Sequence, residues 1–325
     1  MFRAWLLDKP DGVFQASLQE LDESRLPAAE VLVQVLHSTL NYKDALALTD
    51  RAPVVRRWPM VPGIDGAGVV LESRHPAWKP GDRWILNGWG VGETHWGCLA
   101  ERASLQGDWL VPLPARFDTR QAMILGTAGY TAMLCVQAIA ARGLRPQDGE
   151  VLVTGATGGV GSVAVALLAR RGWKVAALTG KASQEGYLRA LGAAEVLERE
   201  AYARPGKPLQ KERWAAVVDT AGSHILANAC AQMRWGGVVA ACGLAQGMDF
   251  PASVAPFILR NVTLAGIDSV MQPAGPRRAA WQALAEEIQG PQLEAMAREL
   301  RLEDVREAAQ ALMDGQASGR AVVAL

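Results

Sequence analysis

Short apolar runs alternate with helical stretches through the second half of the chain. The pattern predicts strands at 151–154, 174–179, 195–198, 214–219 and 237–242, and helices at 160–171, 183–191 and 223–233. The first of these strands is apolar from Val151 to Val153, as expected of a strand that is buried on both faces. Such regular alternation predicts an α/β fold in which helices cover both faces of a parallel sheet.

The first 118 residues have a different pattern. Their apolar runs are short and are separated by turn signals such as Pro62-Gly63 and Pro80-Gly81, which favours mostly β structure. The clearest of these runs lie at 31–36, 67–71 and 83–86. One helical piece is predicted at 42–48 and a long amphipathic helix at 120–142.

The chain continues beyond the alternating half. The pattern there predicts a strand at 262–267, helices at 277–289 and 302–313, and a last strand at 320–325. We therefore expect the parallel sheet to be flanked by other structure on both sides in the sequence.

The turn after the first parallel strand carries the strongest motif. Thr154 to Gly161 contains four glycines and leads into a helix, the context in which a glycine motif indicates dinucleotide binding. Backbone N–H groups and the free helix end can then approach a pyrophosphate, and the residues expected to face it are Thr157, Gly158, Gly159 and Val160. Ala156 stands where the first glycine of G-x-G-x-x-G belongs. The alternative is a glycine-rich turn that binds nothing.

The end of the second parallel strand indicates which dinucleotide is preferred. An acidic residue about 20 positions past the turn accepts a hydrogen bond from the ribose 2′-hydroxyl of NAD. Here the strand ends in Thr179-Gly180-Lys181, and no carboxylate follows until Glu185. A hydroxyl, a small residue and an ammonium suit a 2′-phosphate, which predicts NADPH. Arg199 follows the third strand and either adds a second positive charge or is an ordinary surface arginine, and Lys181 has the same alternative as a solvated loop residue.

Composition and charge argue against nucleic acid and anionic membranes as binding partners. The 325 residues carry 33 basic and 33 acidic side chains, so no polybasic surface is predicted for nucleic acid or an anionic membrane. We expect no apolar run near the roughly 20 residues of a membrane span. The N-terminus lacks a secretory signal, and the four cysteines form no C-x-x-C pair, which favours a cytoplasmic protein with reduced thiols.

Several motifs together resemble one branch of a known family. The chain is similar to the zinc-free medium-chain dehydrogenase/reductases, the quinone-oxidoreductase-like proteins, through Asn41-Tyr42-Lys43-Asp44, Pro62 to Gly68, Gly81-Asp82 and Ala156 to Gly161. Within that branch, further segments resemble the acrylyl-CoA reductase group: Leu21 to Pro27, Gly88 to Glu93, Gly107 to Trp109, Gly126 to Ala132 and Pro256 to Asn261. The group usually has Ser-Gly-Arg where this chain has Thr179-Gly180-Lys181, which keeps the charge without the planar fork of arginine.

The resemblance implies a domain plan. It comprises a GroES-like, mostly β catalytic domain at 1–118, an NADPH-binding Rossmann domain with a doubly wound parallel sheet at 119–260, and a C-terminal segment at 261–325 that returns to the catalytic domain. It also implies a homodimer, with 262–267 as the edge strand that pairs across the two-fold axis.

The resemblance further predicts that no metal takes part. Zinc-dependent members hold their metal with a cysteine, a histidine and a third ligand, and this chain has Asn41 and Ile64 at the first two positions. Neither an amide nor an aliphatic side chain replaces thiolate or imidazole at zinc. His95 lies in the glycine-rich loop, where a hydrogen-bonded structural role is favoured over a role in the site.

The expected reaction is reduction of acrylyl-CoA to propionyl-CoA. A thioester-conjugated alkene is already polarised, so hydride adds to the β-carbon, charge moves to the thioester oxygen, and the α-carbon takes a proton. Tyr42 is the candidate for the nicotinamide side of the site and for proton delivery. Water is the alternative proton donor, and the alternative without a function is that Tyr42 is a packed aromatic residue. Asn41 is the candidate donor to the thioester oxygen, and Asp44 is expected to hold the helix turn.

Other contacts are implied by family likeness alone. Those expected at the cofactor are Leu244, Leu259, Ser269 and Arg320. A different argument applies to coenzyme A, whose phosphates call for a local basic patch. Arg51, Arg56 and Arg57 cluster in one loop and are the candidates, with a solvated loop as the alternative. Two other functions stay open at this point: an NADPH:quinone or general enal reductase on the same scaffold, and a non-catalytic NADPH-binding protein.

Overall fold

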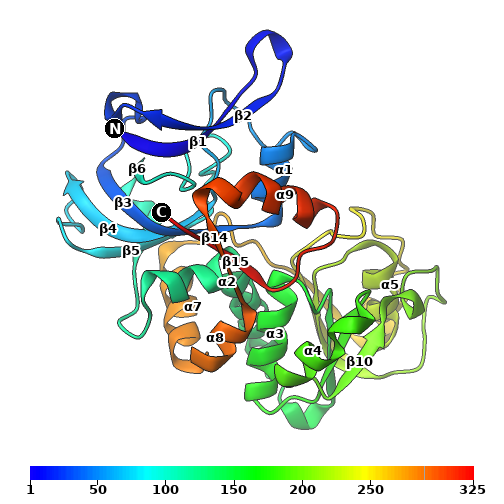
Figure 1. Ribbon diagram of the computed structural model, residues 1–325. Coiled ribbons are helices and arrows are strands. Elements are labelled where there is room, and N and C mark those ends of the chain that lie inside the picture. The colour runs from blue at the N-terminus through cyan, green and yellow to red at the C-terminus, as the bar shows by residue number, and fades with distance from the viewer. Residues whose placement is uncertain (289) are drawn as a thin grey trace. The chain divides into compact units, whose positions relative to one another are not determined.

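The alternating half of the chain forms a parallel sheet in the computed structural model, which describes residues 1–288 and 290–325 (Figure 1). Six strands pair in the order β10-β9-β8-β11-β12-β13 within this described part. Their bounds are β8 (Glu150–Thr154), β9 (Val175–Thr179), β10 (Glu195–Glu198), β11 (Trp214–Asp219), β12 (Met233–Ala241) and β13 (Thr263–Gly266). The associated helices are α3 (Gly159–Arg170), α4 (Glu185–Ala190), α5 (Ser223–Ala231) and α6 (Ala255–Arg260). The predicted doubly wound parallel sheet is confirmed.

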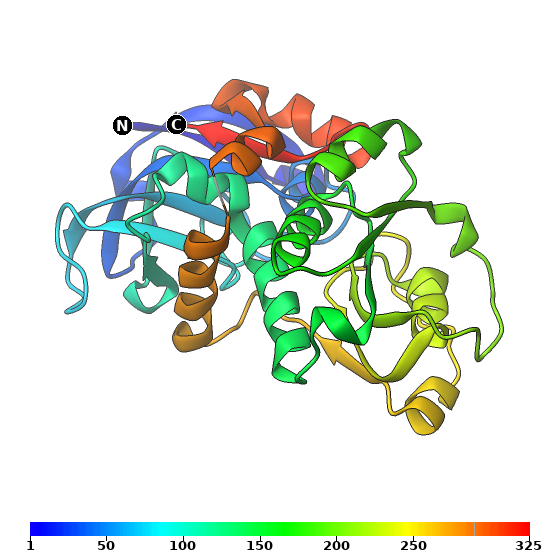
Figure 2. The same ribbon diagram turned by 90° about the horizontal axis from the view of Figure 1, so that it is seen from below.

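The rest of the chain forms a second, mostly antiparallel sheet. Its strand order is β14-β15-β3-β4-β5-β7, β6 pairs with β3, and β1 and β2 form a separate hairpin, all in the described residues. The strands are β1 (Phe2–Asp8), β2 (Gln15–Leu21), β3 (Val31–Leu40), β4 (Asp65–Ser73), β5 (Arg83–Asn87), β6 (Arg102–Leu105), β7 (Leu110–Pro112), β14 (Ala297–Arg301) and β15 (Arg320–Ala324). The helices are α1 (Tyr42–Thr49), α7 (Ala274–Glu287), α8 (Gly290–Met296) and α9 (Val305–Met313). The last strand, β15, therefore pairs with β3 from the first third of the chain, as the domain plan expects (Figure 2).

Two units emerge from the contacts within the chain. Unit 1 comprises 1–127, 269–285 and, in the described part, 290–325, whereas unit 2 comprises 128–268 and 286–288. The expected boundaries were 118/119 and 260/261. The first boundary instead falls inside α2, and the second falls after β13, because β13 pairs with β12 of the parallel sheet.

Helix α2 (Thr119–Ala141) corrects one expectation. Within the described residues it is long and apolar enough to cross a membrane, whereas no apolar run of that length was predicted. However, 83% of its most apolar window is buried inside the protein, which is typical of a core helix. Gly126 interrupts its helical geometry with φ 51° and ψ −154°.

Several element boundaries differ from the predictions. The helix predicted at 183–191 is shorter, and the strand predicted at 237–242 begins four residues earlier, at Met233. The helix predicted at 277–289 spans Ala274–Glu287, and its predicted last residue lies outside the described residues. Strand β14 was missed because its charged sequence, ARELR, lacks a continuous apolar run, and it forms by pairing with β15.

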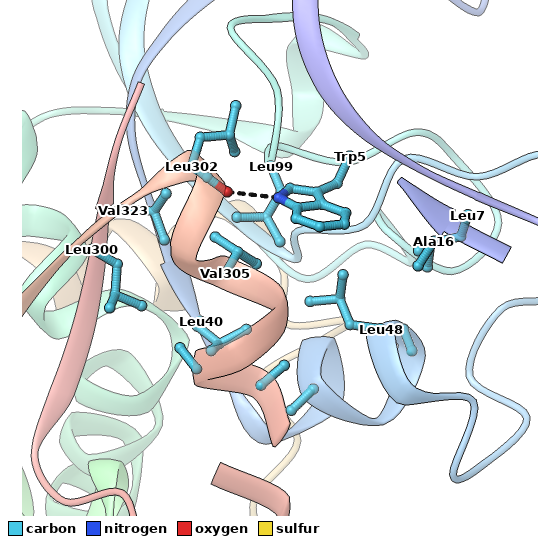
Figure 3. Close-up of a cluster of buried hydrophobic side chains, with 14 of the residues drawn as sticks. Trp5, Leu7, Ala16, Leu40, Leu48, Leu99, Leu300, Leu302, Val305 and Val323 are labelled. Carbon is cyan, nitrogen blue, oxygen red and sulfur yellow. Dashed lines mark hydrogen bonds between the residues drawn. The ribbon is translucent and has the colours of Figure 1, made fainter. Parts of the chain in front are cut away.

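A buried cluster in unit 1 fixes the position of α1 (Figure 3). Trp5, Leu48 and Val305 come from β1, α1 and α9 and pack together with other apolar side chains of the same cluster. The indole Nε1 of Trp5 also donates a hydrogen bond of 2.7 Å to the carbonyl of Leu302. Each such fully buried side chain contributes about 1.5–3 kcal/mol relative to exposure. The cluster holds the helix whose N-terminal end carries Asn41 and Tyr42.

Candidate active site and cofactor-binding turn

A buried carboxylate, Asp65, organises the polar centre of unit 1. It begins β4 and is fully buried. Its Oδ1 accepts hydrogen bonds from Asn87 Nδ2 (2.6 Å) and Thr127 Oγ1 (2.5 Å). Its Oδ2 accepts from Asn41 Nδ2 (2.8 Å) and the Thr127 backbone N–H (2.7 Å). Charge-assisted hydrogen bonds of this kind are stronger than neutral ones, so Asp65 links three separate segments of unit 1.

Helix α7 supports this centre through Asn87. Trp281 Nε1 donates to Asn87 Oδ1 at 2.9 Å, and Arg277 Nη1 donates to the Asn87 carbonyl at 2.6 Å. The Trp281 contact sets the orientation of the Asn87 amide, because Oδ1 must face the indole N–H. Nδ2 is then directed to Asp65.

Asp44 holds the start of α1, as expected. Its Oδ2 accepts from the Asn41 backbone N–H at 2.9 Å, which caps the helix, and its Oδ1 accepts from the Ile64 N–H at 2.9 Å. Burial raises the pKa of Asp44 to about 6, and the nearby charge of Asp65 acts in the same direction. The two backbone hydrogen bonds oppose that rise.

The Asn41 side chain, which was predicted to donate to a thioester oxygen, is hydrogen-bonded within unit 1. Its Nδ2 donates to Asp65 at 2.8 Å and to Asp44 at 3.2 Å, so both amide hydrogens are used inside the protein. Its Oδ1 accepts from Arg320 Nη2 at 3.2 Å. Asn41 therefore has no amide hydrogen left for a thioester oxygen in this arrangement. Its side chain instead positions the start of α1.

Tyr42 is placed differently from its neighbour. It is the first residue of α1, it is 50% exposed, and its hydroxyl makes no hydrogen bond to any described residue. The phenol is therefore available to a ligand. Hydrogen bonds between Asn41 and Asp44 stabilise the helix start that carries it.

Arg320 is buried against the same centre. Its Nε donates to the Ile124 carbonyl at 2.8 Å, and its Nη2 donates to Thr39 Oγ1 at 3.0 Å as well as to Asn41. The bend at Gly126 makes room for it, because a Cβ there would lie 2.7 Å from Asp65 Oδ2 and 2.9 Å from Arg320 Nη2. The side chain thus packs within unit 1, and its contact with a cofactor stays a prediction.

The glycine turn of unit 2 has the form that an anion site requires. Gly155 adopts φ 58°, and a Cβ on Gly161 would lie 2.3 Å from the Gly155 carbonyl oxygen, so both positions need glycine to bring α3 against the turn. Gly158 is the exposed N-cap of α3, and no side chain caps the helix. The first N–H groups, those of Gly159 and Val160, can therefore bind an anion. Thr157, which precedes the N-cap, is buried.

The residues expected at a 2′-phosphate come together beside this turn. Thr179 Oγ1 lies 3.1 Å from Thr157 Oγ1 and accepts from the Lys181 backbone N–H at 3.0 Å. The Arg199 guanidinium lies against Gly180, since a Cβ there would be 2.8 Å from Arg199 Cζ. Burial lowers the pKa of Lys181, and a phosphate beside it would oppose that shift. The Arg199 guanidinium thus packs against a glycine that Lys181 follows directly in the sequence.

Sequence reasoning missed a buried carboxylate in unit 2. Asp219 ends β11, accepts from Thr154 Oγ1 at 2.7 Å and from the Gly222 N–H at 2.9 Å, and so ties the end of β11 to the end of β8. Burial raises its pKa. An acidic residue at the end of an apolar run was the available signal.

The remaining residues that were predicted to contact the cofactor lie in different parts of the chain. Leu244 follows β12 and is 54% exposed, and Leu259 lies on α6 and is 63% exposed. Ser269 falls in unit 1, where its carbonyl accepts from Arg277 Nη2 at 3.4 Å. Their contacts with a nicotinamide stay predictions. His95 has the predicted structural role, with its Nε2 2.6 Å from the Ser104 carbonyl oxygen.

Comparison with known proteins decides the family. A family model described as zinc-binding dehydrogenase matches residues 159–289, and one described as alcohol dehydrogenase GroES-like domain matches residues 27–115. The chain is 51% identical over 321 residues to a protein of Escherichia coli named probable acrylyl-CoA reductase AcuI, and the match covers 99% of each chain. The chain belongs to the medium-chain dehydrogenase/reductases. Its sequence motifs had indicated the same family.

Two further members extend the comparison. The acrylyl-CoA reductase AcuI of Ruegeria pomeroyi is 48% identical over 326 residues, with 99% of each chain covered. The solved structure of the yhdH oxidoreductase from Salmonella enterica in complex with NADP matches with a TM-score of 0.98 and 51% identity, again over 99% of each chain. The whole fold is therefore shared with these medium-chain dehydrogenase/reductases.

Metal independence is a testable property of this medium-chain dehydrogenase/reductase. Among residues 1–288 and 290–325, no three His, Cys, Asp or Glu side chains are grouped so that they could hold a metal ion. We expect the purified protein to keep full activity after dialysis against a chelator, with substoichiometric zinc by elemental analysis. Activity that is lost to the chelator and restored by zinc would contradict this expectation.

Proposed function

We propose that the protein is an NADPH-dependent reductase of the activated double bond of acrylyl-CoA. The observation that carries the proposal is the similarity, over 99% of both chains, to two proteins named acrylyl-CoA reductase. The chemistry of the residues agrees with it, since the uncapped start of α3 suits a pyrophosphate and Lys181 with Arg199 suits a 2′-phosphate.

The proposed reaction needs little acid–base machinery. When bound, NADPH supplies a hydride to the β-carbon of the alkene. Electron density then moves to the thioester oxygen, and the α-carbon must take a proton. Tyr42 is the side chain in unit 1 that we assign to this proton, because the residue is 50% exposed and its hydroxyl has no hydrogen-bond partner in the described residues. Asn41, Asp44 and Asp65 keep the start of α1 in place.

A comparison of acceptors tests the proposal directly. NADPH oxidation is followed at equal concentrations of acrylyl-CoA, a quinone, an enal and no acceptor. We expect the largest kcat/KM with acrylyl-CoA and formation of propionyl-CoA. Preference for the quinone or the enal would support the alternative reductase, and binding of NADPH without oxidation in every case would support a non-catalytic binding protein.

Lys181 should discriminate between the two dinucleotides. Replacing Lys181 by Ala removes a cation beside the expected 2′-phosphate, so the Kd of NADPH should rise about tenfold, which corresponds to about 1.4 kcal/mol, while the Kd of NADH stays nearly unchanged. Fluorescence titration of both cofactors measures this. Lys207→Ala is the matched control, because Lys207 is exposed on the same unit and outside the turn. Equal losses for both cofactors would show that Lys181 does not bind the phosphate.

We further propose a homodimer formed through β13. This strand ends the parallel sheet, and among the described residues it pairs only with β12. Its outer edge therefore offers unpaired backbone groups to a second copy. Light scattering at micromolar concentration should give twice the 34.7 kDa of one chain, and Leu264→Pro should shift the protein to monomer. A monomeric parent protein would refute the proposal.

A further inference from the structure

A polar cavity lies beside the C-terminal end of α1, in unit 1. It has a volume of about 450 Å³ and combines an indole, two cations and one carboxylate. Its lining residues are Lys9, Ala47, Asp50, Arg51, Ala52, Pro53, Val55 and Trp58. None of them belongs to the polar centre around Asp65.

The aromatic side of this cavity is preformed. Phe14 packs edge-on against Trp58 with the ring centroids 6.2 Å apart, which supports the indole. Lys9 Nζ lies 5.4 Å from the centroid of the Trp58 ring and is also 2.8 Å from Asp50 Oδ2. The ammonium lies over the Trp58 ring, and this tryptophan is 36% exposed. A purine nucleotide can use both groups, because its base stacks on the exposed indole while the cation binds its phosphates.

The arginines at the cavity have weak ion pairs or none among the described residues. Arg51 pairs with Asp314 at 2.9 Å, but both side chains are 41% exposed, and exposed pairs of this kind exchange readily for a stronger anion. Arg56 and Arg57 follow in the same loop, both are exposed, and neither has an ion-pair partner in the described part of the chain. The loop therefore offers positive charge that the protein itself does not neutralise.

Helix α1 connects the cavity to Tyr42. Tyr42, Leu46 and Asp50 are spaced four residues apart, so they follow one face of the helix from its start to its C-cap. Tyr42 and Asp50 are exposed and Leu46 is partly exposed, whereas Asp44, Ala45, Ala47 and Leu48 are buried. The eight residues of α1 span about 12 Å at 1.5 Å per residue. This length leaves an exposed helix face along which the extended arm of a thioester substrate can lie.

We propose that the cavity binds the adenosine 3′,5′-bisphosphate end of coenzyme A, with the pantetheine arm along the exposed face of α1 and the acyl group near Tyr42. This proposal rests on the proposed function. The adenine stacks on Trp58, and the phosphates bind Lys9, Arg51 and the arginines that follow, Arg56 and Arg57. The cavity thus selects the CoA thioester over shorter thioesters without touching the reacting atoms.

Truncation of the substrate tests the proposal. Acrylyl-CoA is compared with acrylyl-pantetheine, which has the same reacting group and arm but no nucleotide, in the parent protein and in Arg51→Glu and Trp58→Ala. We expect kcat/KM for acrylyl-CoA to fall at least tenfold in each variant, while kcat/KM for acrylyl-pantetheine stays within twofold of the parent. Arg116→Ala is the control, because Arg116 is an exposed arginine of unit 1 away from the cavity lining.

The possible results distinguish failure of the proposed coenzyme A subsite from failure of the proposed function. Variants that lose both substrates equally would show damage to α1 and would overturn the subsite, as would variants that keep full activity with acrylyl-CoA. Adenosine 3′,5′-bisphosphate should inhibit the parent competitively with acrylyl-CoA and inhibit Arg51→Glu at least tenfold more weakly, and equal inhibition of both would also overturn the subsite. A parent protein that oxidises NADPH with neither thioester would contradict the proposed function instead.

Discussion

Replacing Tyr42 by Phe should lower kcat for acrylyl-CoA reduction by about 10²–10⁴-fold, the range typical of a positioned general acid. The phenol is half-exposed, and its hydroxyl makes no hydrogen bond to a described residue, so its removal breaks no contact inside the protein. If the hydroxyl donates its proton mainly in the transition state, the Kd of NADPH and the KM of acrylyl-CoA should change little. Steady-state kinetics together with fluorescence titration measure these quantities separately.

A control variant on the same helix turn isolates the phenol. Lys43→Ala removes the ion pair with Glu93, which has an N–O distance of 2.8 Å, at the residue next to Tyr42. This variant should keep kcat within a few-fold of the parent. A loss below about tenfold in Tyr42→Phe would show that water is the proton donor. A collapse of NADPH binding in Tyr42→Phe would show that Tyr42 is a cofactor contact first.

The second large effect is expected from Asp65→Asn. Each oxygen of Asp65 accepts two hydrogen bonds, so an amide NH2 on either side faces donors. Asn87 cannot turn to compensate, since its Oδ1 accepts from Trp281 Nε1. At least one buried donor therefore loses its acceptor, along with the charge that strengthened the others. We expect a loss of about 3 kcal/mol in the free energy of unfolding, measured by urea denaturation.

Asp11→Asn is the matched control for this substitution. Asp11 is exposed, adopts φ 51°, a conformation that Asn also tolerates, and accepts no hydrogen bond through its side chain from the described residues. The free energy of unfolding of the Asp11→Asn variant should stay within about 0.5 kcal/mol of that of the parent. If Asp65→Asn unfolds at the same urea concentration as this control, the polar centre does not stabilise unit 1 in the way described.

The periodic parts of the fold could be predicted from sequence. Runs such as Val151 to Val153 are apolar because neighbouring strands and helices cover both faces, and this pattern is local. Strand β14 could not be predicted this way, because its charged residues form a strand only through pairing with β15. The boundary between the units was also missed, since α2 continues through it and the break at Gly126 depends on contacts with Asp65 and Arg320.

Some parts of the candidate site could likewise be predicted from local sequence, and others depend on residues far away in the chain. The glycine turn and Thr179-Gly180-Lys181 follow single strands, so their local sequence was sufficient to predict where they lie. The hydrogen-bond partners of Asn41 were not visible in the sequence, because Asp65 lies 24 positions away and Arg320 lies 279 positions away. A residue type that can bind substrate can equally hold the fold, and only the hydrogen-bond partners distinguish the two roles.

Deuterium transfer tests the central claim most directly. NADPH carrying deuterium at its transferable position is mixed with the protein and acrylyl-CoA in ordinary water, and the product is analysed by mass spectrometry and NMR. We expect propionyl-CoA with one deuterium on the β-carbon and a solvent-derived hydrogen on the α-carbon. Propionyl-CoA with deuterium on the α-carbon or with none, or the absence of propionyl-CoA altogether, would contradict direct hydride transfer from NADPH to acrylyl-CoA.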